Sequence, residues 1–181
     1  MTEAANFPPY AISFYETVID EHLHLAVMAF AMFREIADQG EDAVKASIYL
    51  NSALSNCAAI ARYFDPSRKY AFTEVRTHYL RQAYGIDEKS AILDRNLRNF
   101  IEHLDERIDI WLESDPVGPI IPSTIFASNS IVDDGFGHVF RVIDAENDIY
   151  VGLGMKYEYG QLAREAVRLY LRDEQEAEAD E

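Results

Sequence analysis

The strongest helical pattern in this chain is LDRNLRNFIEHLDERIDIWL, Leu93–Leu112, and the fold prediction starts from it. Its apolar side chains recur every three or four positions, as on one face of an α-helix: Leu93, Leu97, Phe100, Ile101, Leu104, Ile108 and Trp111. At about 100° per residue, the opposite side carries Arg98, Asn99, Glu102 and His103. We expect one face to pack into a core while the other presents a cation, an amide, a carboxylate and an imidazole.

Three more amphipathic patterns precede this one and also predict helices. Pro8 and Pro9 suit the first turn of a helix, Gly40 follows its end, and Asp65-Pro66 ends the next helix. The predicted helical spans are about 8–37, 41–63, 73–84 and 88–113. The first two thirds of the chain should therefore form a helical bundle.

The final third has a different pattern. Residues 138–144 and 149–157 read as two strands around a turn at 145–148, and residues 159–172 read as an amphipathic helix. Within the second strand, Gly152-Leu153-Gly154 indicates a bulge or a close backbone approach. The predicted fold is mainly α: an antiparallel bundle of about four helices with an appended β-hairpin and a C-terminal helix.

The domain prediction follows these changes in pattern. Residues 1–114 form the bundle, residues 115–172 pack on it within the same domain, and residues 173–181 form an acidic tail. With 181 residues the chain is long enough to bury a real core.

Charge and composition limit the function. The chain has 32 acidic and 16 basic side chains, a formal charge of −16, which argues against broad binding to nucleic-acid phosphates but allows a small local cationic site. The single cysteine, Cys57, is expected to be a buried thiol. No signal peptide is evident, and the apolar run 25–33 is too short to span a bilayer. We therefore expect a cytoplasmic protein with no membrane association.

The polar face of the opening stretch has the chemistry for RNA cleavage without a metal ion or other cofactor. An arginine can hold a phosphate, a histidine can move a proton near neutral pH, and an asparagine can orient either one. RNA supplies its own nucleophile, the 2′-hydroxyl. On a continuous helix Arg98 and His103 are about 140° apart, so a facing helix or a second subunit has to close such a site.

The residues alone leave a plainer interpretation open. Arg98 and Glu102 are spaced for an intrahelical ion pair, and the polar face is then simply solvated. Asn56, on the second predicted helix, either points into the same cleft or satisfies a contact between helices.

The hexapeptide RNFIEH, Arg98–His103, resembles the R-x4-6-H motif of the HEPN superfamily, including the polar residue that often follows the arginine. The order of the neighbouring segments is similar too: SALSNCAAIARYF, then RTHYLRQAYGI, then RNLRNFIEHLDERIDIW. The resemblance covers about residues 8–114. The hairpin and helix after residue 120 are not part of the family's core.

This resemblance implies a helical bundle that is usually a homodimer, with motif residues of both subunits facing one cleft. It implies metal-independent ribonuclease activity of toxin or phage-defence type, with an antitoxin protein as a partner. Arg98 and His103 take the catalytic roles and Asn99 supports them, while Glu102, Arg95 and Asn56 are candidate binding residues. Because the chain is acidic, this function requires Arg62, Arg81, Arg95 and Arg98 to gather near the cleft. The alternative is a non-catalytic helical dimer that binds a nucleotide or another protein.

Overall fold

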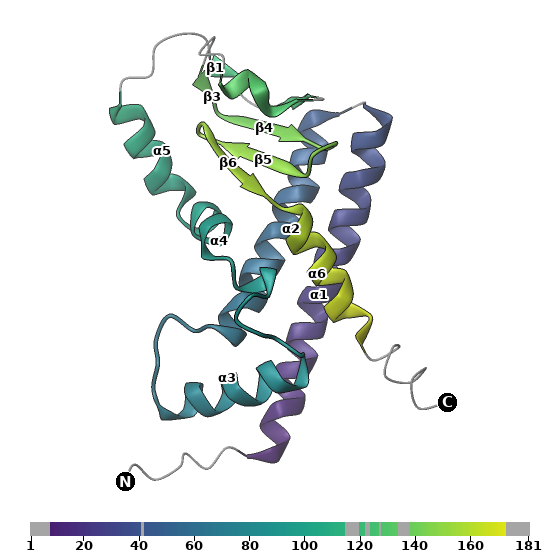
Figure 1. Ribbon diagram of the computed structural model, residues 1–181, viewed down its shortest axis with the longest axis vertical. Helices are drawn as coiled ribbons and strands as arrows, with labels where there is room; N and C mark the ends of the chain where they lie inside the picture. Colours follow the sequence, from purple (N-terminus) through teal and green to yellow (C-terminus); the bar gives the residue numbers. More distant parts are fainter. Residues whose placement is uncertain are drawn as a thin grey trace.

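The protein is built around a hairpin of two long antiparallel helices, α1 (Pro9–Gln39) and α2 (Ala43–Phe64), shown in Figure 1. The computed structural model describes residues 8–40, 42–114, 120–121, 124–126, 128–133 and 138–172. Gly40 ends α1 with φ 67°, a left-handed conformation that glycine adopts without strain. Asp42 caps α2 by accepting a hydrogen bond of 2.9 Å from the backbone N–H of Lys45. Both predicted helices are therefore confirmed.

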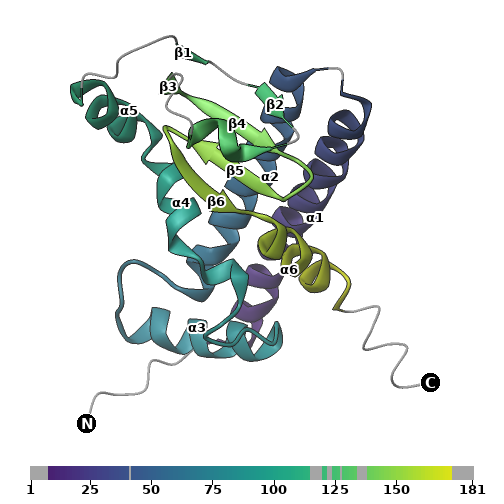
Figure 2. The same ribbon diagram turned by 45° about the horizontal axis from the view of Figure 1, so that its top comes forward.

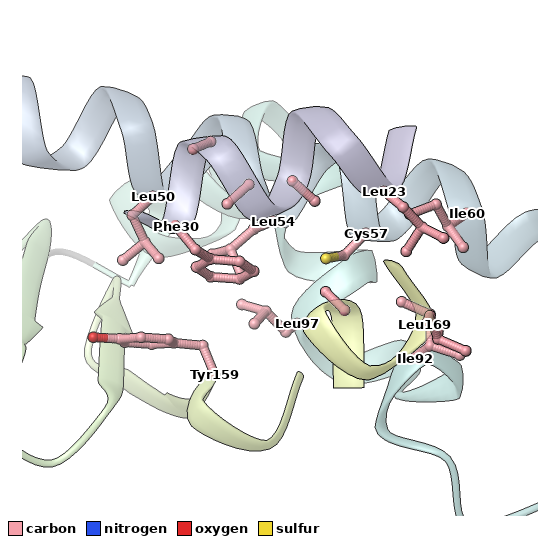
Figure 3. Close-up of a cluster of buried hydrophobic side chains, with 14 of the residues drawn as sticks. Leu23, Phe30, Leu50, Leu54, Cys57, Ile60, Ile92, Leu97, Tyr159 and Leu169 are labelled. Atoms are coloured by element: carbon pink, nitrogen blue, oxygen red, sulfur yellow. The ribbon is translucent and has the colours of Figure 1, made fainter. Parts of the chain in front are cut away.

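One hydrophobic core joins this hairpin to the later elements (Figure 3). Small residues on α2 allow α1 to approach closely, and Leu23 and Phe30 of α1 are buried there. The same core also contains Leu97, which belongs to the stretch 93–112, and Ile92, the residue just before it. Tyr159 and Leu169, from near the C-terminus, pack there as well. The core thus includes residues from the predicted bundle, 1–114, and from the segment that follows it, 115–172.

Helix α3 (Ala71–Ala83) crosses the end of the hairpin where α1 begins (Figure 1). Tyr84, directly after α3, is buried, and its hydroxyl donates a hydrogen bond of 2.9 Å to Oδ1 of Asp20 on α1. Arg172 also donates to Asp20, at 2.8 Å, and its guanidinium lies 3.9 Å from the centre of the Tyr84 ring. This contact ties α1, α3 and the C-terminal end of the described chain together.

The continuous helix predicted for residues 88–113 is wrong. The segment contains a 3-10 turn η1 (Ala91–Leu93), then α4 (Arg95–Glu102), and after a break at His103 it continues as α5 (Leu104–Glu113). His103 has φ −119° and ψ 34°, which is not helical. No glycine or proline lies nearby. The break follows instead from packing, because Leu97 and Phe100 of α4 are buried whereas α5 has no buried residue.

The C-terminal third forms a four-stranded sheet in the order β2-β4-β5-β6. Its strands are β2 (Thr124–Phe126), β4 (Arg141–Asp144), β5 (Ile149–Gly152) and β6 (Met155–Glu158). Strand β2 runs parallel to β4, and the other pairs are antiparallel. A separate short pair, β1 (Ile120–Ile121) and β3 (His138–Val139), is parallel.

The predicted hairpin is therefore present as β4 and β5, but the strand predicted for residues 149–157 is in fact two strands. They meet at a turn where Leu153 has φ 50° and Gly154 has φ 80°. Two successive positive φ values are typical of the tight turn that joins antiparallel strands. The two glycines of Gly152-Leu153-Gly154 thus have different roles: Gly152 is the last residue of β5, whereas Gly154 belongs to the turn.

Helix α6 (Gly160–Tyr170) follows β6 and packs along α1 (Figure 2). The mainly α fold with an appended antiparallel hairpin and a C-terminal helix is confirmed. Residues 115–119, which follow the predicted bundle, and the predicted acidic tail at 173–181 lie outside the described residues. Within the described ranges, no helix is both long and apolar enough to cross a membrane.

Candidate functional site

The motif helix α4 is held between α2 and the sheet. The Phe100 ring lies 4.9 Å from the Tyr157 ring of β6 and 5.9 Å from the Tyr150 ring of β5, measured between centroids. Leu97, on the same side of α4, enters the core beside α2. These two anchors fix the rotation of α4, so Asn99, Glu102 and His103 are on its exposed side.

His103 occupies the joint between α4 and α5. Its backbone N–H donates to the carbonyl of Asn99 at 3.2 Å, and its own carbonyl accepts from Arg107 at 3.0 Å. The imidazole is about half exposed, at 53%, and Nδ1 lies 3.6 Å from Oε1 of Glu106. Because the backbone is not helical here, the 140° separation from Arg98 that a continuous helix would impose does not apply.

Arg98 lies within α4, but the structure does not describe its side chain. The polar residues of the motif whose side chains the structure describes are Asn99, Glu102 and His103, and we call them the motif surface. All three residues are exposed. The predicted amide, carboxylate and imidazole are therefore neighbours on one surface of the protein.

Glu102 forms an ion pair with Arg62 of α2. Oε1 of Glu102 accepts from Nε at 2.9 Å and from Nη2 at 2.5 Å. The Arg62 side chain is more than half exposed, so solvent screens this pair strongly. The ion pair places the Arg62 guanidinium beside the motif surface, but this guanidinium is already bound by the Glu102 carboxylate.

Arg95 makes a second link between the same two helices. Its Nε donates to Oδ2 of Asp65 at 2.6 Å, and its Nη2 contacts the same oxygen. Asp65 is buried at the C-terminal end of α2. Arg95 and Glu102 thus fasten the two ends of α4 to the last turns of α2.

Asn56 is engaged elsewhere. Its Oδ1 lies 2.8 Å from Nδ1 of His22 on α1, and its Nδ2 donates to the carbonyl of Ser52 at 2.8 Å. The side chain therefore satisfies a contact between α1 and α2, the second of its two predicted roles. The structure does not bring it to the motif surface.

A cavity of about 600 Å³ lies between the end of α2, α3 and the start of α4. Its charged lining consists of Asp65, Lys69, Glu74, Arg81, Glu88 and Arg95, together with His78. Two of the arginines expected to gather near the site, Arg81 and Arg95, therefore line one cavity. Arg81 donates to Glu88 at 2.8 Å and to the carbonyl of Phe64 at 2.8 Å.

Two residues of this cavity, Lys69 and His78, were not among the predicted site residues. A signal for them exists in the local charge, because residues 62–81 contain five basic and two acidic side chains in a chain where acids outnumber bases two to one. Among the described residues, no three or more His, Cys, Asp or Glu side chains are grouped as they would be to hold a metal ion.

Comparisons of the chain with protein families, with curated proteins and with solved structures find no match.

Proposed function

We propose that the protein is a HEPN-like ribonuclease that cleaves RNA without a metal ion. The observation that carries this proposal is the exposure of Asn99, Glu102 and His103 together at the break between α4 and α5. An imidazole that is half exposed can reach an external substrate. The buried Leu97 and Phe100 hold the helix beneath it in place, so the group is positioned before the substrate binds.

In the proposed reaction, His103 accepts the proton of a ribose 2′-hydroxyl as that oxygen attacks the adjacent phosphorus. The O2′–P bond forms and the P–O5′ bond breaks, leaving a 2′,3′-cyclic phosphate and a 5′-hydroxyl. Arg98 binds the non-bridging oxygens, where negative charge builds up, and Asn99 orients the phosphate or the imidazole.

The departing O5′ also needs a proton, and a single imidazole on the attacking side does not reach it. In a homodimer with the two motif surfaces facing each other, the partner's His103 supplies that proton. The proposal therefore includes a homodimer. Members of the toxin class act with an antitoxin, and a protein that covers the motif surface would block the reaction.

A second candidate function is a non-catalytic interaction module. It is favoured by the two ion pairs, Arg62 with Glu102 and Arg95 with Asp65, which satisfy charges around the motif within the chain itself. In that case the same surface docks a nucleotide or a protein without cutting RNA.

The test is cleavage of a panel of single-stranded RNAs in EDTA by the wild-type protein and by the variants His103→Ala and Arg98→Ala. The matched control is His24→Ala, which removes an exposed imidazole from α1, far from the motif in sequence. We expect wild type and His24→Ala to leave cyclic phosphate ends, and His103→Ala to cut at least 100-fold more slowly, as is typical for loss of a general base.

A substrate with a 2′-deoxyribose at the cut position should resist cleavage, because it lacks the nucleophile. Failure of folded wild-type protein to cut any RNA in the panel, or unchanged cutting by His103→Ala, would overturn the proposal. The interaction module would then be the better account of the motif surface.

A further inference from the structure

The strongest local departure from the acidic character of this chain lies next to the motif helix. Residues 62–81 contain five of the 16 basic side chains but only two of the 32 acidic ones, a local charge of +3 (five minus two) in a chain of −16. The basic residues are Arg62, Arg68, Lys69, Arg76 and Arg81. An acidic protein repels polyanions over most of its surface, so such a segment is where an anionic ligand can approach.

Several of these cations have no carboxylate partner among the residues that the structure describes. Arg68 and Lys69 are exposed, and their side chains make no ion pair with any residue that the structure describes. The guanidinium of Arg76 lies over the rings of Tyr15 and Tyr63, at 5.3 and 5.8 Å. Its charge is therefore stabilised by aromatic faces rather than cancelled by an acid.

Arg81 is paired, but its charge remains available. Its partner Glu88 is 89% exposed, and a pair with such an exposed carboxylate is weak and open to exchange. The hydrogen bond from Nε to the Phe64 carbonyl keeps the guanidinium at the cavity wall. A phosphate entering the cavity would therefore meet a positioned arginine beside Lys69.

Exposed aromatic rings accompany these cations. Tyr70 is 60% exposed and Tyr79 is 45% exposed. Each follows a residue that lines the cavity, Lys69 and His78 respectively. The His78 and Tyr79 rings lie 6.0 Å apart. Cations that follow the backbone, together with exposed rings on which bases stack, are the usual components of single-strand binding surfaces.

The surface also lies close to the motif. Arg95 lines the cavity and precedes Glu102 by two turns of α4, a distance of about 10 Å along the helix. Arg62, which begins the basic segment, is paired with Glu102 itself. A strand held in the cavity can therefore continue along α4 to the motif surface.

We propose that Lys69, Tyr70, His78, Tyr79 and Arg81 form a binding surface for single-stranded RNA, which we call the α3 surface. It delivers the strand to the motif surface on α4. The choice of RNA rests on the proposed ribonuclease function, whereas the binding itself depends on the charges and rings described above. Duplex nucleic acid is the competing ligand, and it offers no unstacked bases to the tyrosines.

The test measures binding in the His103→Ala background, in which the proposed reaction does not consume the RNA. Fluorescence anisotropy with labelled U12 and A12 RNA, at 50 to 200 mM salt, gives the affinity and its dependence on salt. In this background we add Lys69→Ala, Tyr79→Ala or, as the charge control, Lys45→Ala. Lys45 is an exposed cation at the start of α2, at the opposite end of that helix from the basic segment.

We expect Lys69→Ala to weaken binding and to reduce the slope of log affinity against log salt by about 0.7, the loss of one single-strand phosphate contact. Tyr79→Ala should weaken binding at least fivefold through the loss of one stacked base. Lys45→Ala should change neither quantity. Lys69→Ala and Lys45→Ala should keep the circular dichroism spectrum and melting temperature of the parent, because both side chains are exposed. Tyr79 is only 45% exposed, so the circular dichroism spectrum and melting temperature of Tyr79→Ala are measured to establish that this variant is folded under the conditions of the binding assay.

Three results would each overturn the inference. The first is the absence of binding to either RNA at 50 mM salt, and the second is binding that Lys69→Ala and Tyr79→Ala leave unchanged. The third is tighter binding of a duplex than of its single strands. If wild type cuts RNA but the α3 variants bind normally, only this inference fails. If binding depends on the α3 surface but no RNA is cut, only the ribonuclease proposal fails.

Discussion

The ring of Phe100 lies directly against the backbone of Gly152: a Cβ atom added to the glycine would be 2.2 Å from Cζ of the ring. The φ angle of Gly152 is not in the left-handed region, so the position needs glycine for space rather than for backbone freedom. Phe100 comes three residues before His103, and its contact with β5 therefore helps to orient the motif surface.

Gly152→Ala should lower the free energy of unfolding by about 1–3 kcal/mol, because a buried ring has to move out of the way of the new methyl group. Urea unfolding followed by circular dichroism measures the loss. The double variant with Phe100→Leu should recover part of it, giving a coupling free energy of at least 0.5 kcal/mol. Strict additivity of the two changes would contradict the close contact.

Glu102→Gln should strengthen RNA binding in the His103→Ala background. The change removes a negative charge from the motif surface and releases Arg62 from its ion pair, so an additional cation can contact phosphate. We expect a few-fold tighter anisotropy titration and a salt dependence steeper by about 0.7. Glu106→Gln removes an equal charge one turn further on and is the matched control. Weaker binding by Glu102→Gln would instead indicate that Glu102 itself contacts the ligand.

Asp144 should make stability depend on pH in the acid range. Burial opposes its ionisation, but hydrogen bonds from the side chains and backbones of Asn147 and Asn129 outweigh burial and lower the pKa of the carboxyl. The unfolded chain therefore binds a proton at this carboxyl more readily than the folded protein does. The stability that the carboxylate contributes is present above the unfolded pKa of about 3.9 and is lost as the pH falls through the lower pKa of the folded state.

The measurement is urea unfolding of wild type and Asp144→Asn between pH 2.5 and 7. The variant should be less stable by about 2 kcal/mol at pH 7, because an amide cannot accept all of these hydrogen bonds. The difference should narrow toward pH 2.5. A constant difference over the whole range would show that the carboxylate charge does not stabilise the fold.

Four buried tyrosines should make the protein sensitive to alkali. Burial raises the pKa of Tyr84, Tyr150 and Tyr157 above the usual value, and it raises that of Tyr159 to about 12. The folded state thus holds these protons after the unfolded chain has lost them, and stability falls as the pH rises above about 10. Absorbance of tyrosinate at 295 nm should show a late step that coincides with unfolding by circular dichroism. A single smooth titration before unfolding would contradict this expectation.

The helical hairpin could be predicted because its signals are local. Proline at the start of α1, Gly40 at its end and Asp65-Pro66 at the end of α2 each act within a few residues. The break at His103 has no such signal. It arises because Leu97 and Phe100 are held by α2 and the sheet, and the Phe100 contact with Gly152 spans 52 positions (152 minus 100) in the sequence.

Only those features of the candidate site that depend on local sequence could be predicted. Helical periodicity places Asn99, Glu102 and His103 away from the apolar face, and all three residues are exposed in the structure, although His103 lies just beyond the end of α4. The partner of Glu102 could not be predicted, because Arg62 is 40 residues away and the intrahelical spacing pointed to Arg98. The net charge of −16 gives no indication of the basic segment 62–81, because acidic side chains elsewhere in the chain outweigh it.

The position of α4 between α2 and the sheet has a consequence for synthesis on the ribosome. An isolated helix of eight residues is not stable in water, so α4 depends on its neighbours to form. Gly152 and Tyr157, which seat Phe100, are translated about 50 residues after the motif. A nascent chain that already contains Asn99 and His103 therefore still lacks the strands against which Phe100 packs, and the motif surface becomes ordered only after β5 and β6 have been synthesised.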